Sequence, residues 1–67
     1  MARRYSITVE GTLSTKTAEE FAPFHVECHG TTSSVEGARL DQSALRAVLR
    51  RLDALGLTVL SVTSSAL

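Results

Sequence analysis

The dipeptide Gly30-Thr31 separates two extended runs, and this short turn constrains the fold more than any other feature of the chain. A two-residue loop with glycine first is a common hairpin turn, and its length fixes which residues of the two strands face each other. The register that follows pairs His29 with Thr32, Cys28 with Ser33, Glu27 with Ser34, Val26 with Val35, His25 with Glu36 and Phe24 with Gly37. It matches Val26 with Val35 on one face, a match that a slip of one residue would destroy. We therefore predict an antiparallel hairpin over residues 24–37.

Two further strands are predicted from residues that alternate or are rich in β-branched side chains. The first covers Tyr5–Glu10 and ends at Gly11, and the last covers Leu57–Thr63. The strands at residues 5–10 and 24–29 each alternate apolar and polar residues, so we expect one face of the sheet to be buried and the other to be polar.

The clearest helix follows Asp41, whose carboxylate is a favourable N-cap. Its apolar residues recur at spacings of three and four, which predicts a buried stripe. That expected stripe consists of Leu45, Val48, Leu49, Leu52 and Leu55. Gly56 stands where a left-handed residue commonly ends a helix, and Leu57 is placed to fold back on Leu52.

A shorter helix is predicted within Ser14–Ala22. Thr17 followed by Glu20 matches a capping box, and Pro23 prevents the helix from continuing beyond Ala22.

The order strand, short helix, strand, strand, long helix, strand is that of the split βαβ or ferredoxin-like arrangement. We therefore expect an α+β fold, a minimal ferredoxin-like βαββαβ domain with a four-stranded antiparallel sheet and both helices on one face. The alternative is a βββαβ fold in which the first helix is reduced to a loop. At 67 residues the chain forms a single domain, residues 1–67, with flexible ends at 1–4 and 64–67.

Composition excludes several classes of function. The chain is 43% hydrophobic and 21% charged, as expected of a globular domain. Seven basic residues balance seven acidic ones, which argues against nucleic acid and anionic membranes as partners. The single cysteine excludes an internal disulfide, and the chain lacks an apolar run long enough to span a membrane or the apolar core of an export signal. We expect a cytoplasmic protein.

The strongest chemical pattern is His25-x-Glu27-x-His29, which places three polar side chains on one face of a strand. Imidazole and carboxylate suit zinc, copper or nickel, and Glu36 across the hairpin, or Glu10, could add a ligand. The alternative is a solvated strand face on which His25 pairs with Glu36. The spacing is not that of a zinc motif, so we favour the solvated face and expect no cofactor. Cys28 should point to the opposite face as a small buried residue, so a Cys/His nucleophile is not expected.

The last strand is apolar on both sides, because Leu57 and Val59 alternate with Leu60 and Val62. Such a strand is usually covered on both faces, and in the expected fold it lies at a sheet edge. Small domains without a disulfide or metal commonly associate with a second copy. These four residues are therefore the predicted interface of a homo-oligomer, most simply a dimer.

The stretch Leu40–Val62 also resembles a set of small uncharacterised actinobacterial proteins. The similarity lies in Asp41-Gln42, Ala44-Leu45, the leucine-rich helix, Leu55-Gly56-Leu57 and Leu60-Ser61-Val62, together with the opening run 5–11 and the turn 30–32. The resemblance implies a soluble cytoplasmic protein of unassigned activity, and it implies no catalytic residue.

Two classes of function follow. The favoured one is a non-enzymatic binding or interaction module that acts through self-association or a protein partner. The alternative is a cofactor-independent ferredoxin-like enzyme or small-ligand domain with a pocket near His25 and His29. The sequence offers no nucleophile and base on one face, which argues against the enzyme.

Overall fold

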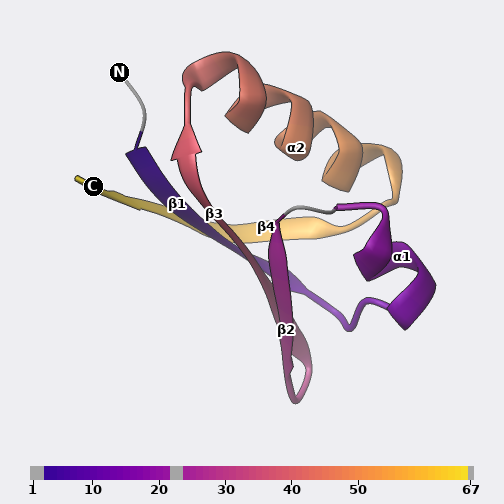
Figure 1. The fold of residues 1–67 in the computed structure, drawn as a ribbon. Coiled ribbons are helices and arrows are strands. Elements are labelled where there is room, and N and C mark those ends of the chain that lie inside the picture. Colours follow the sequence, from indigo (N-terminus) through magenta and orange to yellow (C-terminus); the bar gives the residue numbers. More distant parts are fainter. Residues whose placement is uncertain (1–2, 22–23, 67) are drawn as a thin grey trace.

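The computed structural model describes residues 3–21 and 24–66 and contains four strands and two helices (Figure 1). In chain order they are β1 (Arg3–Glu10), α1 (Thr15–Glu19), β2 (His25–His29), β3 (Thr32–Leu40), α2 (Gln42–Ala54) and β4 (Thr58–Ser65). This confirms the predicted α+β class and the βαββαβ order. The first helix is present rather than replaced by a loop, but it is only five residues long.

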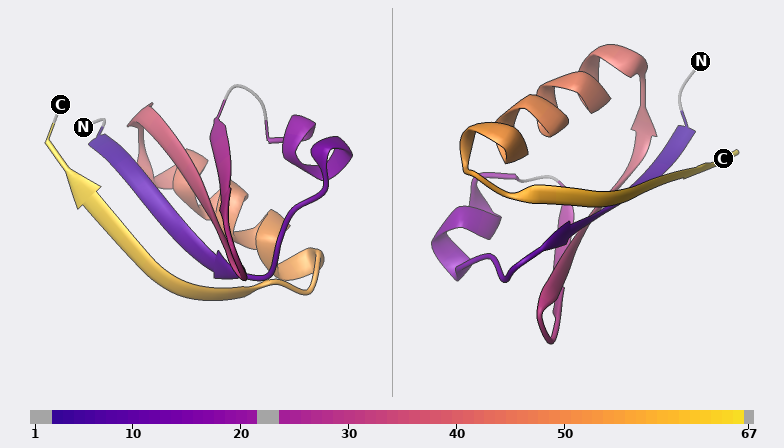
Figure 2. Two further views of the ribbon diagram at one scale, coloured as in Figure 1. Left: turned by 90° about the horizontal axis from the view of Figure 1, so that it is seen from below. Right: turned by 180° about the vertical axis from the view of Figure 1, so that it is seen from behind.

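The strands form one sheet in the order β2-β3-β1-β4, and every neighbouring pair is antiparallel. Each helix therefore links two strands that are separated in the sheet by a third, which is the split βαβ connection. The first strand of the chain is central, whereas β2 and β4 are the two edges (Figure 2).

The hairpin has the predicted register. The observed pairs of β2 and β3 are His25–Glu36, Val26–Val35, Glu27–Ser34, Cys28–Ser33 and His29–Thr32. Phe24 lies just before β2, and its ring packs against the backbone of Gly37 instead of forming a further pair.

Helix α2 begins and ends where the sequence predicts. The Asp41 carboxylate accepts a hydrogen bond from the Ala44 amide at 2.8 Å. At the other end, Gly56 has φ 77°, and the Gly56 and Leu57 amides donate to the carbonyls of Asp53 and Leu52. This pair of bonds is the Schellman motif, which satisfies two of the last carbonyl groups of the helix.

Helix α1 has a different cap from the one predicted. Ser14, not Thr17, is the N-cap, and its hydroxyl accepts a hydrogen bond from the Thr17 amide at 3.1 Å. An N-cap needs an extended backbone and a side-chain oxygen, and Ser14 provides both one turn before Thr17. The predicted end of the helix at Ala22 and Pro23 lies outside the described residues.

The core lies between the sheet and the two helical segments. Its buried residues come from the strands, from the segments that flank α1, and from α2: Ile7, Val9, Leu13, Phe21, Val35, Val48 and Leu52. Because residues beside both helices belong to one cluster, both helical segments pack on the same face of the sheet. The predicted α2 stripe is only partly correct: Leu45 and Leu49 are half-buried, whereas Leu55 is 45% exposed because it caps the helix beyond its last turn.

Strand β4 departs from the predicted alternation. Its register with β1 shifts by one residue, so that Val59 pairs with Val9, Ser61 pairs with Thr8, and Leu60 has no partner. This extra residue is a β-bulge, which changes the face that the following side chains occupy. Val62 therefore pairs with the core residue Ile7, and both valines lie on the helix-facing side instead of on opposite sides.

The expected flexible ends lie partly outside the described residues, which exclude 1–2 and 67. Of the remaining end residues, Arg3 and Arg4 begin β1, and Ser64 and Ser65 end β4. Neither α1 nor α2 is long and apolar enough to cross a membrane.

Candidate functional site

The sheet face that points away from the helices is polar, as the alternation predicts. Three rows of side chains cross it from β2 through β3 to β1. The rows are His25–Glu36–Ser6, Glu27–Ser34–Thr8 and His29–Thr32–Glu10. All the predicted ligand residues, His25, Glu27, His29 and Glu36, therefore share this open face.

Glu27 stands between the two histidines of β2. One of its oxygens, Oε1, lies 3.0 Å from Nε2 of His25, and the other, Oε2, lies 3.4 Å from Nε2 of His29. The side chains of all three are about half exposed or more. On a strand, alternate residues point to the same side, so one carboxylate can reach both neighbours.

His29 has a second partner across the hairpin. Its Nε2 atom lies 3.2 Å from the hydroxyl of Ser34, which is buried although it belongs to the open face. This contact holds the imidazole of His29 over β3. Sequence reasoning placed Ser34 on this face but did not identify it as a partner of His29, because Ser34 lies diagonally from it and opposite Glu27 in the register.

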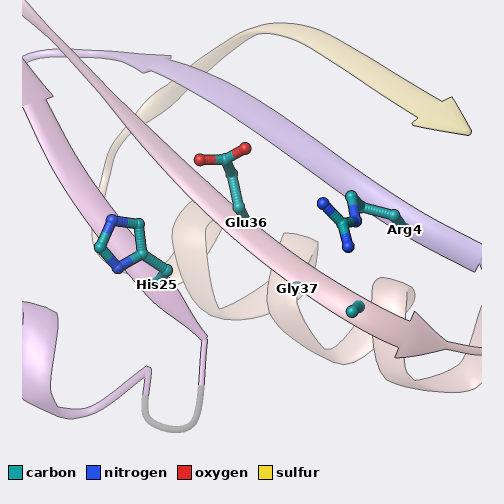
Figure 3. Close-up of a pocket in the computed structure, with 5 residues that line it drawn as sticks. Arg4, His25, Glu36 and Gly37 are labelled. Atoms are coloured by element: carbon teal, nitrogen blue, oxygen red, sulfur yellow. The ribbon is translucent and has the colours of Figure 1, made fainter.

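His25 and Glu36 are directly opposed, as predicted, yet no hydrogen bond or ion pair joins them in the described part of the chain. Instead they line a hollow of about 300 Å³ together with Arg4, Gly37 and Ala38 (Figure 3). Glu36 lies between His25 and Arg4 in this view. Arg4 was not among the predicted site residues, because its position depends on the pairing of β1 with β3.

The contact between His25 and Glu27 changes the acidity of both groups. The hydrogen bond to Glu27 is the main reason why the pKa of His25 lies above its ordinary value of 6.5, with smaller contributions from the charges of Glu27 and Glu36. The same hydrogen bond holds the pKa of Glu27 below its ordinary value of 4.5. The pair is therefore arranged to favour an imidazolium and a carboxylate.

This arrangement does not resemble a metal centre. Among the described residues, no three His, Cys, Asp or Glu side chains are placed to hold a metal ion. Each imidazole nitrogen instead contacts a different oxygen of the Glu27 carboxylate.

Cys28 points to the helix side, opposite to the histidines, as predicted from the strand geometry. Its sulfur lies 3.7 Å from the Leu13 carbonyl oxygen and 3.7 Å from the Ser33 hydroxyl. The expectation that it is buried is wrong, because Cys28 is exposed on an edge strand.

The predicted interface residues differ in exposure. Val59, Leu60 and Val62 are 37%, 52% and 43% exposed, and all three belong to the edge strand β4. Leu57 precedes this strand and packs against the core. The exposed apolar surface of the predicted interface is therefore that of β4 alone.

No curated protein and no solved structure matches the chain. A domain family of unknown function, DUF8691, matches residues 4–63, which include both helices and nearly all of the sheet. The chain therefore belongs to the DUF8691 family, a domain of unknown function, in keeping with its resemblance to uncharacterised small proteins.

Proposed function

We propose that this protein is a small non-enzymatic interaction module of the cytoplasm that associates with a second copy of itself through β4. The single observation that carries the proposal is the difference between the two edges of the sheet. Edge strands expose unpaired backbone groups, and proteins protect them with short strands and charged side chains.

Strand β2 has such protection. It is five residues long, and His25, Glu27 and His29 place ionisable groups along it. Strand β4 has neither: it is eight residues long, contains no charged residue, and exposes every one of its side chains. Its bulge at Leu60 leaves Ser61–Ser65 as a regular edge. Its exposed apolar residues, Val59, Leu60 and Val62, add surface that association would remove from water.

Size and charge also support self-association. A chain of 67 residues has a small core, and domains of this size commonly gain stability from a second copy. The formal net charge is zero, so two copies do not repel each other through their overall charge.

Sedimentation equilibrium over a range of concentrations tests the proposal. We expect a dimer at micromolar concentrations, and a monomer of 7.2 kDa throughout would contradict it. Val62→Lys places a charge on the proposed edge and should weaken the dimer at least about tenfold. The matched control is His25→Lys on the opposite edge, which should leave the dimer unchanged.

A second candidate, a small-ligand domain, is favoured by the hollow beside His25. Arg4 and Glu36 line it together and offer opposite charges, which suits a small zwitterion. Glycine is a direct probe. A saturating shift of the His25 ring signals in an NMR titration, lost in Arg4→Gln, would support this function, and unchanged signals would exclude it.

A further inference from the structure

The regular part of β4 is its second half. Residues Ser61–Ser65 pair in unbroken register with β1, whereas Leu60 has no partner there. A bulge disturbs the spacing of backbone groups and bends the strand. A second strand that adds to the outer edge of β4 can therefore form a regular ladder only with Ser61–Ser65.

Symmetry restricts how two copies of this segment can pair. Two identical strands related by a two-fold axis run antiparallel, and each interface residue then meets its symmetric counterpart in reverse order. In an antiparallel pair, opposed residues turn their backbone groups either toward each other or both away. Along one strand, the backbone groups of successive residues point to alternate sides. A residue can therefore oppose only its own copy, or a residue of the partner that is an even number of positions away. The axis must therefore pass midway between the two copies of one residue.

We infer that the two-fold axis of the dimer passes between the two copies of Thr63. This inference rests on the proposed function, and it follows because Thr63 is the centre of the regular segment and gives the longest ladder. Thr63 then opposes the partner's Thr63, Val62 opposes the partner's Ser64, and Ser61 opposes the partner's Ser65. The two four-stranded sheets become one continuous sheet with both β4 strands at its centre.

The side chains fit this register. Thr63 pairs with Ser6 and so lies on the open face, where opposed threonines form a favourable cross-strand pair. Val62 lies on the helix-facing side and is 43% exposed, so the partner's Ser64 and the diagonal Val62 of the partner subunit would cover it. Leu60 lies at the end of the ladder, where its bulge does not interrupt pairing. No charged side chain is brought against another, because β4 contains none.

Cysteine cross-linking tests the position of the axis. In a Cys28→Ser background, which removes the only native thiol, single cysteines are placed at positions 61, 62, 63 and 64. Thr63→Cys brings two thiols face to face, with Cα atoms about 4.5 to 5.5 Å apart, which a disulfide can bridge. Ser61→Cys is the matched control: its two copies would lie about 13 Å apart along the strands, beyond the reach of about 7 Å.

We expect mild oxidation to convert most of Thr63→Cys, and little of Ser61→Cys, to a covalent dimer on non-reducing gels. The double variant Ser61→Cys/Ser65→Cys should cross-link as fully as Thr63→Cys, because these positions oppose each other. Stronger cross-linking of Val62→Cys or Ser64→Cys than of Thr63→Cys would show that the axis lies at another residue, and would overturn the inference. If the Cys28→Ser protein sediments as a dimer but Thr63→Cys does not cross-link, the register is wrong while the proposed function stands. A monomeric parent would overturn both.

Discussion

The ring of Phe24 lies so close to Gly37 that a Cβ atom at position 37 would stand 2.5 Å from Cδ1 of the ring and 3.0 Å from Cδ1 of Leu40. We expect Gly37→Ala to destabilise the protein by about 1 to 3 kcal/mol, because the ring has to move out of its packed position. Chemical denaturation measures the loss. In a Phe24→Ala background the same change should cost clearly less, and equal costs in both backgrounds would show that the ring is not responsible.

Leu52 is the most deeply buried residue of α2, with no exposed surface. Leu52→Ala should lower the free energy of unfolding by about 2 to 5 kcal/mol, because it leaves a cavity beneath the helix. Leu55→Ala is the matched control, since Leu55 is 45% exposed and should cost much less. Similar melting temperatures for the two variants would contradict the packing of α2.

The ion pair of His25 and Glu27 predicts a specific dependence on pH. Since the pKa of His25 is raised in the folded protein, its contribution to stability is complete below 6.5 and is lost as the pH rises through the raised value. Since the pKa of Glu27 is lowered, its contribution is complete above 4.5 and is lost as the pH falls through the lowered value. The pair therefore stabilises the fold most between these two ordinary values.

An NMR titration of the His25 ring checks this window. The midpoint should lie above 6.5 and fall in Glu27→Gln, which removes the carboxylate charge. Glu36→Gln should lower it by less, because the charge of Glu36 is the smallest of the contributions. A midpoint that Glu27→Gln leaves unchanged would rule out this pairing.

The cluster on β2 should not hold a stoichiometric metal, because Glu27 separates the two imidazoles. Elemental analysis of protein purified without chelators, and again after incubation with zinc, measures metal content per chain. We expect well below one ion per chain in both samples. One zinc per chain, lost in the His25→Ala/His29→Ala variant, would show instead that Glu27 and the imidazoles rearrange around an ion.

The sequence predicts most of this fold because its signals are local. The turn at Gly30-Thr31 determines the register of the hairpin, and Asp41 and Gly56 mark the two ends of α2. The polar face follows from the alternation of residues along the strand, so the spacing of His25, Glu27 and His29 is enough to place them side by side.

Other features depend on contacts that sequence periodicity does not encode. The bulge at Leu60 appears only when β4 is aligned with β1, and it moves Val62 to the helix-facing side. The hollow beside His25 includes Arg4 because β1 pairs with β3, far away in the sequence. The register places Ser34 diagonally from His29, but whether the two side chains meet depends on their rotamers.

The central position of β1 has a consequence for how the chain folds. Its hydrogen-bonded neighbours are β3 and β4, and Ser6 meets Thr63 across 57 positions of sequence. Chain closure over such a distance costs entropy before any contact compensates for it, and proteins dominated by such pairs fold slowly. The hairpin of β2 and β3 needs only a two-residue loop, so it can form on its own in microseconds. We therefore expect the insertion of β1 between that hairpin and β4 to limit the folding rate. In stopped-flow refolding, substitutions in β1 should then change the rate more than substitutions in β2.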